Sequence, residues 1–339
     1  MRSKARIIYN PTSGRENFKR FLPDVLAVYE QVGYDTSAYS TTAFPLSAQK
    51  EAERCTKENF DLIIAVGGDG TINEVINGMA PFEHRPKLAI IPAGTTNDYA
   101  RALNIPRHQY VEAAKLIHKN QSVVMDIGHI RTGENQRYFI NIGAAGSLTE
   151  VTYDVPANMK TIFGQLAYFV RGAELLPRIG NVPVRITYDG GVYEGNAALV
   201  LVALTNSVGG FEKIAPDKTL GDGKFTLIIV KTKNLVEILR LITMLMNDGK
   251  HINHPKVLYT KTSFVKAETI YDEQLLINID GEYGGDAPAE FTMYQQHIDI
   301  VTDVDRMKLA IEAPDLTRIE KESEFIEQVQ QLDEENIEP

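Results

Sequence analysis

Residues 62–71 read LIIAVGGDGT, an apolar run that ends in a turn with three glycines and one aspartate. The apolar run predicts a buried strand, and residues 71–79 carry apolar side chains at the spacing of a helix. Glycines let main-chain N–H groups approach a ligand, and a helix N-terminus attracts negative charge. The stretch therefore predicts a strand, turn and helix that cradle phosphates. A tight turn capped by Asp69 explains the bare glycines equally well.

The segments on either side repeat the alternation of strand and helix. Strands are expected at residues 6–9, 34–39, 62–66 and 88–91, and helices at 16–32, 47–56, 71–79 and from about Asp98. Successive βα units predict a parallel sheet with helices on both faces, which binds ligands beyond the carboxyl ends of its strands. We therefore expect a doubly wound α/β nucleotide-binding domain over residues 1–121.

The pattern changes after about Ser122 to short β-branched runs separated by Gly, Asn or Asp, which is typical of a β domain. Strands are expected at residues 123–130, 138–142, 184–188, 197–203, 225–230, 257–259, 275–279 and 297–301, with helices at 160–176 and 235–246. We therefore expect a β-rich domain over residues 122–300. The segment 301–339 either returns to the first domain or forms a solvated acidic tail.

Composition is that of an ordinary globular protein of 339 residues, 43% hydrophobic, with a net charge of −10. Residues 317–339 carry −6 of that charge and leave −4 for the rest, so the basic surface of a nucleic-acid-binding protein is absent. Cys55 is the only cysteine, which indicates a reducing compartment. The first residues lack a secretory pattern, and no apolar run reaches the length of a membrane span. We expect a cytoplasmic protein.

A second turn, residues 91–101 with the sequence IPAGTTNDYAR, follows the next strand and is expected to lie beside the first. No GxxxxGK[ST] sequence is present, and the glycine spacing does not match the dinucleotide fingerprint, so P-loop enzymes and dehydrogenases are excluded. Together, GGDGT and GTTNDYAR resemble the diacylglycerol kinase catalytic domain family, which includes sphingoid-base and ceramide kinases. NAD kinases share the first sequence but not this form of the second.

The resemblance extends over roughly residues 5 to 300 and is nearest to the bacterial soluble diacylglycerol kinases. It rests further on YNPTSG at residues 9–14 and on segments 139–143, 206–210, 214–217, 220–223 and 280–282. It implies an N-terminal α/β domain that binds ATP and a C-terminal β-sandwich. The positions that resemble nucleotide contacts are Asn10, Pro11, Thr12, Ser13, Gly14, Thr41, Gly67, Gly68, Asp69, Gly70, Thr71, Ile72, Asn73 and Thr95. From the sequence alone, Thr41 is equally well an exposed loop residue.

Three carboxylates are expected to carry the chemistry. By resemblance, Glu282 is the general base that accepts the proton of a lipid hydroxyl, and Asp69 holds catalytic Mg²⁺ against the phosphates. Asp98 is expected near Asp69, although helix capping is an equally good local explanation. Without the resemblance, the Asp-Gly-Glu of residues 280–282 is more often an exposed hairpin turn than a catalytic site.

A second, structural Mg²⁺ is implied by the resemblance of residues 217–224. The Asp222 carboxylate and the main-chain carbonyls of Thr219 and Lys224 are its expected ligands, and carbonyl ligands do not depend on side-chain identity. A type I′ turn at Asp222-Gly223 is an equally good alternative.

The expected substrate is diacylglycerol or a related lipid, which places the protein at the inner membrane face as a peripheral enzyme. Basic residues that could meet anionic headgroups are Arg15, Arg20, Lys160 and Arg171, although the apolar side chains of helix 160–176 are more often core. The alternatives are a kinase of a sphingoid base, ceramide or phosphatidylglycerol, and a lipid- or nucleotide-binding regulator without catalysis. Monomer and homodimer both stay open.

Overall fold

The computed structural model describes residues 2–13, 17–146, 181–204, 221–234, 250–271 and 273–305, with the single positions 237, 241 and 244. The expected helix 160–176, most of the expected helix 235–246 and the segment after residue 305 therefore lie outside the described residues. In the described ranges, no helix combines the length and apolar character that crossing a bilayer requires.

Four parallel strands form the sheet of the first domain, in the order β2-β1-β3-β4. They are β1 (Ser3–Tyr9), β2 (Tyr34–Ser40), β3 (Leu62–Gly67) and β4 (Lys87–Pro92). Residues 62–66 of β3 have no exposed surface, as expected for a strand covered on both faces. Each predicted strand of residues 1–121 is confirmed.

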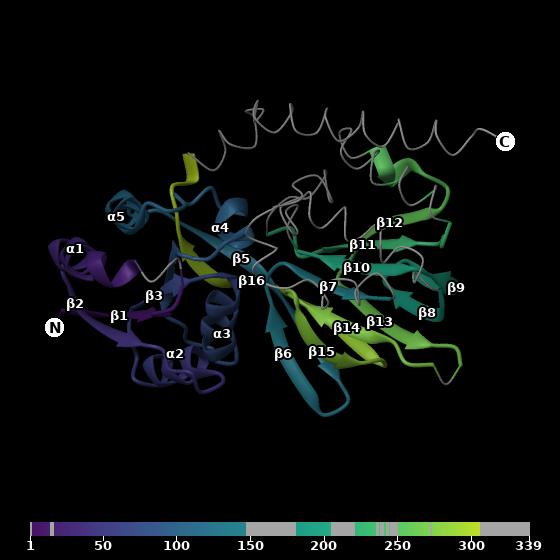
Figure 1. Cartoon of the computed structure of the whole chain (residues 1–339), viewed down its shortest axis with the longest axis horizontal. Coiled ribbons are helices and arrows are strands. Elements are labelled where there is room, and N and C mark those ends of the chain that lie inside the picture. The colour runs from purple at the N-terminus through teal and green to yellow at the C-terminus, as the bar shows by residue number, and fades with distance from the viewer. Residues whose placement is uncertain are drawn as a thin grey trace.

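Helices cover both faces of this sheet, which confirms the doubly wound arrangement. They are α1 (Phe18–Gln31), α2 (Ser47–Lys57), α3 (Asp69–Met79), α4 (Asp98–Ala102) and α5 (Tyr110–Ala114), followed by the 3₁₀ turn η2 (Lys115–Lys119). In Figure 1, α1 and α5 lie on one side of the sheet and α2 and α3 on the other. The apolar residues of α3 that set its helical spacing are all buried.

The order of the strands creates a crevice at the carboxyl edge of the sheet. Because β1 lies between β2 and β3, the loops that leave β1 and β3 run in opposite directions, and ligands of such sheets bind at this point. Two main-chain hydrogen bonds fix the loop ends there: the N–H of Asn10 donates to Val66 at 2.9 Å, and that of Thr41 to Tyr9 at 2.9 Å.

The second domain is a sandwich of two sheets, as predicted. One sheet has the order β12-β11-β10-β7-β14-β15, and the other continues from the first domain as β16-β13-β8-β9, with β5 paired to β16 and β6 paired to β5. Its strands are β5 (Ser122–Thr132), β6 (Asn135–Phe139), β7 (Ile142–Ala145), β8 (Val182–Tyr188), β9 (Gly191–Ala197), β10 (Leu199–Ala203), β11 (Phe225–Val230), β12 (Val257–Thr262), β13 (Phe264–Thr269), β14 (Leu276–Ile279), β15 (Glu282–Asp286) and β16 (Ala289–Val301), with the 3₁₀ turn η4 (Lys250–Asn253) before β12.

The two sheets enclose a second apolar core. Ile186 and Phe291 contribute from one sheet, and Val202 and Ile277 from the other. The outer face of the six-stranded sheet carries a third cluster, which Leu241 joins. The sequence pattern does not predict β9, β13 and β15, and it predicts one strand over residues 138–142 where the structure has β6 and β7.

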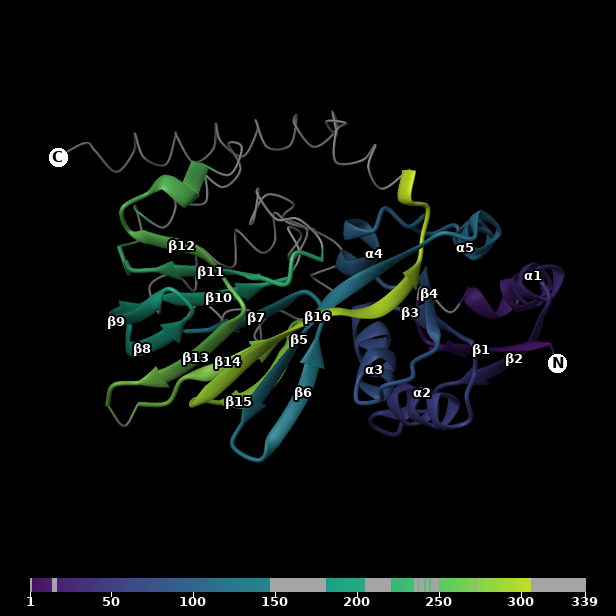
Figure 2. The ribbon, with the colours of Figure 1, turned by 180° about the vertical axis from the view of Figure 1, so that it is seen from behind.

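Strands β5 and β16 connect the two domains as one antiparallel ribbon. Ile300 of β16 pairs with Leu88 of β4 in the first domain, while Thr292 pairs with Phe264 of β13 in the second. Figure 2 shows this ribbon running from the sheet of the first domain into the sandwich. Thr302, just after β16, donates from Oγ1 to the carbonyl of Leu103 at 3.2 Å. The last described residues therefore contact the first domain.

Candidate active site

The two glycine turns predicted to be neighbours touch through their main chains. A Cβ atom on Gly94 would lie 2.4 Å from the Cα of Gly68, and one on Gly68 would lie 3.2 Å from the Cα of Gly94. The N–H of Ala93 donates to the carbonyl of Gly67 at 2.8 Å, next to this contact. The glycines are therefore required because two backbones meet, with no room between them for a side chain.

Asn97 locks the second turn in place. Its side chain is fully buried and its backbone is left-handed, with φ of 50°. The N–H of Gly94 donates to Asn97 Oδ1 at 2.9 Å, and Asn97 Nδ2 donates back to the carbonyl of Gly94 at 2.8 Å. Thr95 is exposed at the tip of this turn, where a ligand can reach it.

Asp69 begins α3 beside the second turn and carries a perturbed carboxylate. The N–H of Tyr99 donates to its Oδ1 at 3.4 Å. Burial first, and then the nearby negative charge of Asp98, raise the pKa of Asp69 to about 6. The site thus disfavours its own negative charge, and a bound cation would relieve this repulsion.

Mg²⁺ fits this pair of carboxylates. In proteins Mg²⁺ is commonly held by one or two carboxylates together with waters and substrate phosphates. Across the described ranges, no group of three or more His, Cys, Asp and Glu side chains could hold a metal ion by itself. Asp69, with Asp98 nearby, therefore suits a metal that arrives with a phosphorylated ligand.

The β14–β15 turn brings the second domain onto this site. Asp280 and Gly281 both have positive φ, at 50° and 90°, and Ile279 pairs with Glu282 across them, so the predicted two-residue hairpin turn is present. The carboxylate of Asp280 accepts three main-chain N–H groups, from Ile140, Asn141 and Ile142 at 3.0, 3.0 and 2.9 Å. Because these N–H groups donate to Asp280, they are not available for hydrogen bonds between strands, which explains why β6 and β7 are separate strands.

Glu282 stands at the start of β15 and faces the first glycine turn. A Cβ atom on Gly70 would lie 3.8 Å from Oε1 of Glu282. The Glu282 side chain is 62% exposed, and its Oε2 accepts a hydrogen bond from Nη2 of Arg137 at 3.0 Å. The fold thus brings the predicted base to the predicted phosphate cradle, although the two belong to different domains.

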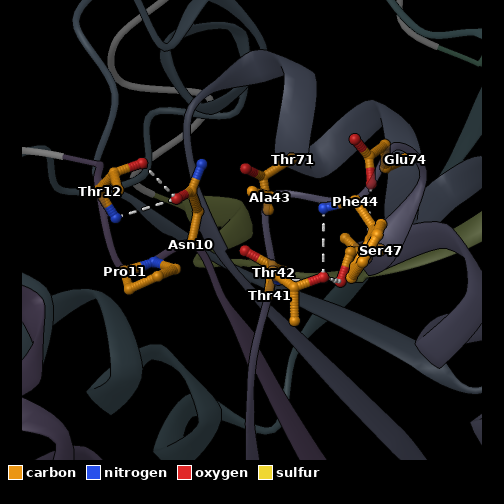
Figure 3. Close-up of a pocket in the computed structure, with 11 residues that line it drawn as sticks. Asn10, Pro11, Thr12, Thr41, Thr42, Ala43, Phe44, Ser47, Thr71 and Glu74 are labelled. Carbon is orange, nitrogen blue, oxygen red and sulfur yellow. Dashed lines mark hydrogen bonds between the residues drawn. The ribbon is translucent and has the colours of Figure 1, made fainter.

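A pocket of about 250 Å³ opens at the carboxyl edge of the sheet, beside α3 (Figure 3). Five of the predicted nucleotide contacts line it, namely Asn10, Pro11, Thr12, Thr41 and Thr71. The other lining residues were not predicted from the sequence; they are Thr42, Ala43, Phe44, Ser47, Ala48 and Glu74. Most of these residues follow β2 in the chain. They could have been predicted from the rule that ligands of such sheets bind beyond the carboxyl ends of the strands.

Hydrogen bonds hold both walls of the pocket. Asn10 Oδ1 accepts from the N–H of Thr12 at 3.0 Å and from its hydroxyl at 2.8 Å. On the other wall, Ser47 Oγ accepts the N–H of Thr42 at 3.0 Å, and Glu74 accepts the N–H of Ala48 at 2.9 Å. Phe44 is 78% exposed at the rim.

Two of the predicted nucleotide contacts, Ile72 and Asn73, have buried side chains. Ile72 has no exposed surface and packs in the first core, so its side chain cannot touch a bound nucleotide. Asn73 is 4% exposed, and its amide is engaged by the second domain. Ser13 is described in the loop after Asn10, whereas Gly14 lies outside the described residues.

The predicted second metal site is described only in part. Asp222 Oδ1 accepts the N–H of Lys224 at 3.0 Å, and its Oδ2 lies 4.0 Å from Nζ of Lys261. The Lys224 side chain points to Asp189, with Nζ 3.0 Å from Oδ2. Thr219 lies outside the described residues, so this site stays a prediction.

Comparison with known proteins identifies the family. A model of the diacylglycerol kinase catalytic domain matches residues 4–130, and a model of the YegS C-terminal NAD kinase beta sandwich-like domain matches residues 144–302. Curated diacylglycerol kinases of Bacillus subtilis strain 168 and Staphylococcus aureus strain MRSA252 are 51% and 50% identical, over 88% of this chain and 96% and 92% of their own.

Solved structures agree with this assignment. Two crystal structures from Bacillus anthracis strain Sterne superpose with TM-scores of 0.76 and 0.67, at 29% and 27% identity. Each covers 89% of this chain, and they match over 96% and 97% of their own length. The second of them is a diacylglycerol kinase. Because about half of the aligned residues are identical to those of curated relatives, over 88% of this chain and nearly the whole length of those relatives, the chain belongs to the diacylglycerol kinase family of enzymes.

Proposed function

We propose that the chain transfers the γ-phosphoryl group of ATP to the free hydroxyl of diacylglycerol, which gives phosphatidic acid. The observation that carries the proposal is the approach of Glu282 to Gly70, a carboxylate beside a glycine turn that opens a helix. Phosphoryl transfer needs alignment, neutralised charge and one base near the attacking oxygen. The family supports the substrate, because the curated relatives are diacylglycerol kinases.

ATP would be bound at the crevice between β1 and β3. Main-chain N–H groups of the turn over residues 67–71 would bind the phosphates. At the contact of Gly68 with Gly94 there is no room for a side chain, so the main chain of the turn stays open to a ligand. The adjoining pocket would receive the nucleoside, with the hydroxyls of Thr12, Thr41 and Thr71 on its walls. Thr95 would contact the phosphates from the second turn.

Asp69 would hold Mg²⁺, with Asp98 as its neighbour. When bound, the ion neutralises charge on the phosphates and relieves the repulsion that raises the pKa of Asp69. A second, structural ion at Asp222 is a separate part of the proposal, with the main-chain carbonyls of Thr219 and Lys224 as further ligands.

Glu282 would act as the general base. As the lipid oxygen bonds to the γ-phosphorus, the bond from that phosphorus to the bridging oxygen of ADP breaks, and the hydroxyl proton passes to the Glu282 carboxylate. The exposure of this side chain supports the role, because a lipid headgroup must reach it. Since the acceptor resides in a bilayer, we further propose peripheral contact with the cytoplasmic face of the membrane.

Residues 1–121 and 122–300 remain the proposed limits of the two domains.

The experiment is transfer of labelled γ-phosphate from ATP to a panel of acceptors in mixed micelles. Diacylglycerol, a sphingoid base, ceramide, phosphatidylglycerol and NAD are offered separately at equal concentration. Label should appear on diacylglycerol far faster than on the other acceptors. Label on another acceptor alone, or on none of them, would overturn the proposal.

A further inference from the structure

Arg137 joins the two domains at the proposed base. It lies in β6, and a single guanidinium nitrogen, Nη2, is 3.0 Å from Oε2 of Glu282 and 3.3 Å from Oδ1 of Asn73. Asn73 belongs to α3, the helix that the glycine turn opens, and Glu282 belongs to the β14–β15 hairpin. The guanidinium therefore bridges the phosphate cradle and the base.

The anchor on the α3 side is rigid. Asn73 Nδ2 donates to Asp280 at 2.8 Å, and its Oδ1 accepts from Asn77 Nδ2 at 3.0 Å as well as from Arg137. These bonds use both ends of the amide, so its orientation is fixed. Asn77 in turn is clamped to β6, because it exchanges two hydrogen bonds with the main chain of Tyr138, at 2.8 and 2.9 Å.

Glu282, by contrast, has few restraints of its own. Its side chain is 62% exposed, while that of Arg137 is 29% exposed. In the part of the chain that the structure describes, the Arg137 guanidinium is the one hydrogen-bond partner of the Glu282 carboxylate. Glutamate has three side-chain torsions, so without this partner the carboxylate would sample many positions away from the glycine turn.

We propose that Arg137 is a positioning residue for the reaction, which holds the Glu282 carboxylate toward the glycine turn by anchoring it to Asn73. The inference rests on the proposed function of Glu282 as the base. An exposed ion pair contributes little to stability, so stabilisation alone poorly explains this contact. Direct binding of ATP phosphate by Arg137 is the competing role, and kinetics separate the two.

The test compares Arg137→Ala with the unaltered chain. Loss of positioning should lower kcat with diacylglycerol roughly 10- to 100-fold, because misplacement of a catalytic group by about 1 Å can lower the rate by about 100-fold. KM for ATP should stay within about twofold, since the proposed role involves no contact with the nucleotide. Guanidinium ion added at millimolar concentration should restore part of kcat, and sodium ion at equal ionic strength should not.

Two further variants make the result decisive. Arg185→Ala removes an exposed ion pair of similar kind, with Glu194 at 2.6 Å on β8 and β9, and should leave kcat unchanged. Arg137→Lys keeps the charge but not the planar donor, so its kcat should lie between those of the alanine variant and the unaltered chain. If the alanine variant fails to fold, the lysine variant carries the same test.

Three outcomes would overturn the inference. They are an unchanged kcat in both Arg137 variants, a rise in KM for ATP that accounts for the whole loss, and an equal loss in Arg185→Ala. With the unaltered chain active, these outcomes remove only the role of Arg137. Absence of transfer by the unaltered chain would remove the proposed function together with this inference.

Discussion

Asn73 of α3 donates a 2.8 Å hydrogen bond to the carboxylate of Asp280 in the β14–β15 turn. A residue of the first domain thereby holds the turn that presents Glu282. Removal of Asp280 from water raises the pKa of its carboxyl group, and its hydrogen bonds oppose that shift. The turn therefore depends on every donor that the carboxylate receives.

Asn73→Ala tests this dependence. Asp280 would lose one of its four donors, and a hydrogen bond to a charged group contributes about 1.5–3 kcal/mol. We expect the free energy of unfolding to fall by about that amount and kcat to fall as the hairpin shifts. Thermal unfolding and kcat measure both effects. The control is Asn135→Ala at the exposed first residue of β6, and equal stability of the two variants would contradict the assignment.

Gly94→Ala tests the contact of the two turns. The new Cβ would lie 2.4 Å from the Cα of Gly68 and 2.9 Å from Oδ1 of Asn97, so the backbone must shift. Overpacking of this kind typically costs about 1–3 kcal/mol. We expect a lower thermal midpoint and weaker ATP binding.

Gly70→Ala provides the comparison for stability. Among the described residues, a Cβ on Gly70 would meet only the Glu282 carboxylate, at 3.8 Å, and alanine favours the helix that begins at this turn. Its thermal midpoint should match or exceed that of the unaltered chain. A Gly94 variant as stable as the Gly70 variant would show that the turns do not pack as described.

The first domain could be predicted from the sequence because its signals are local. Residues 62–66 and the apolar spacing of α3 specify a buried strand and a helix without reference to the rest of the chain. The same holds for the Asp280-Gly281 turn, because only a few residue types accept positive φ at both positions.

Other features depend on distant partners and left no local signal. Strand β15 contains two glycines and forms because the hairpin turn aligns it with β14. Strand β13 follows β12 after a single residue, so no turn residues separate them in the sequence. The contacts of Arg137 with Asn73 and Glu282 appear only once the two domains are assembled.

The raised pKa of Asp69 predicts how stability depends on pH without metal. In the unfolded chain an aspartate titrates near ~3.9, whereas Asp69 titrates at about 6 when folded. Between these values the folded chain binds the extra proton, so stability falls as pH rises through this window and the penalty is complete above about 6. The penalty is absent below about 3.9.

Asp69→Asn should remove that penalty. In the presence of a chelator, we expect the variant to be more stable at pH 7.5 by roughly 3 kcal/mol at most, and equally stable at about pH 4. Chemical denaturation across this pH range measures the difference. Asp24→Asn, at an exposed position of α1, should show no such trend. A lower stability of Asp69→Asn at pH 7.5 would contradict the origin assigned to the shift.

Glu282 is the residue on which the proposed chemistry depends most. Glu282→Gln keeps the shape of the side chain and an oxygen that can accept from Arg137, but it removes the basic carboxylate. Glu290→Gln is the matched control, because Glu290 pairs with Arg131 on the β5–β16 ribbon away from the glycine turn.

The most direct measurement is kcat for phosphate transfer from ATP to diacylglycerol by Glu282→Gln, with ATP affinity and thermal midpoint determined on the same sample. Loss of a general base lowers the rate by about 10²- to 10⁴-fold, and we predict a fall in that range. ATP affinity, the thermal midpoint and the kcat of the Glu290 control should match the unaltered chain. A kcat for Glu282→Gln close to that of the unaltered chain would contradict the assignment of Glu282 as the base.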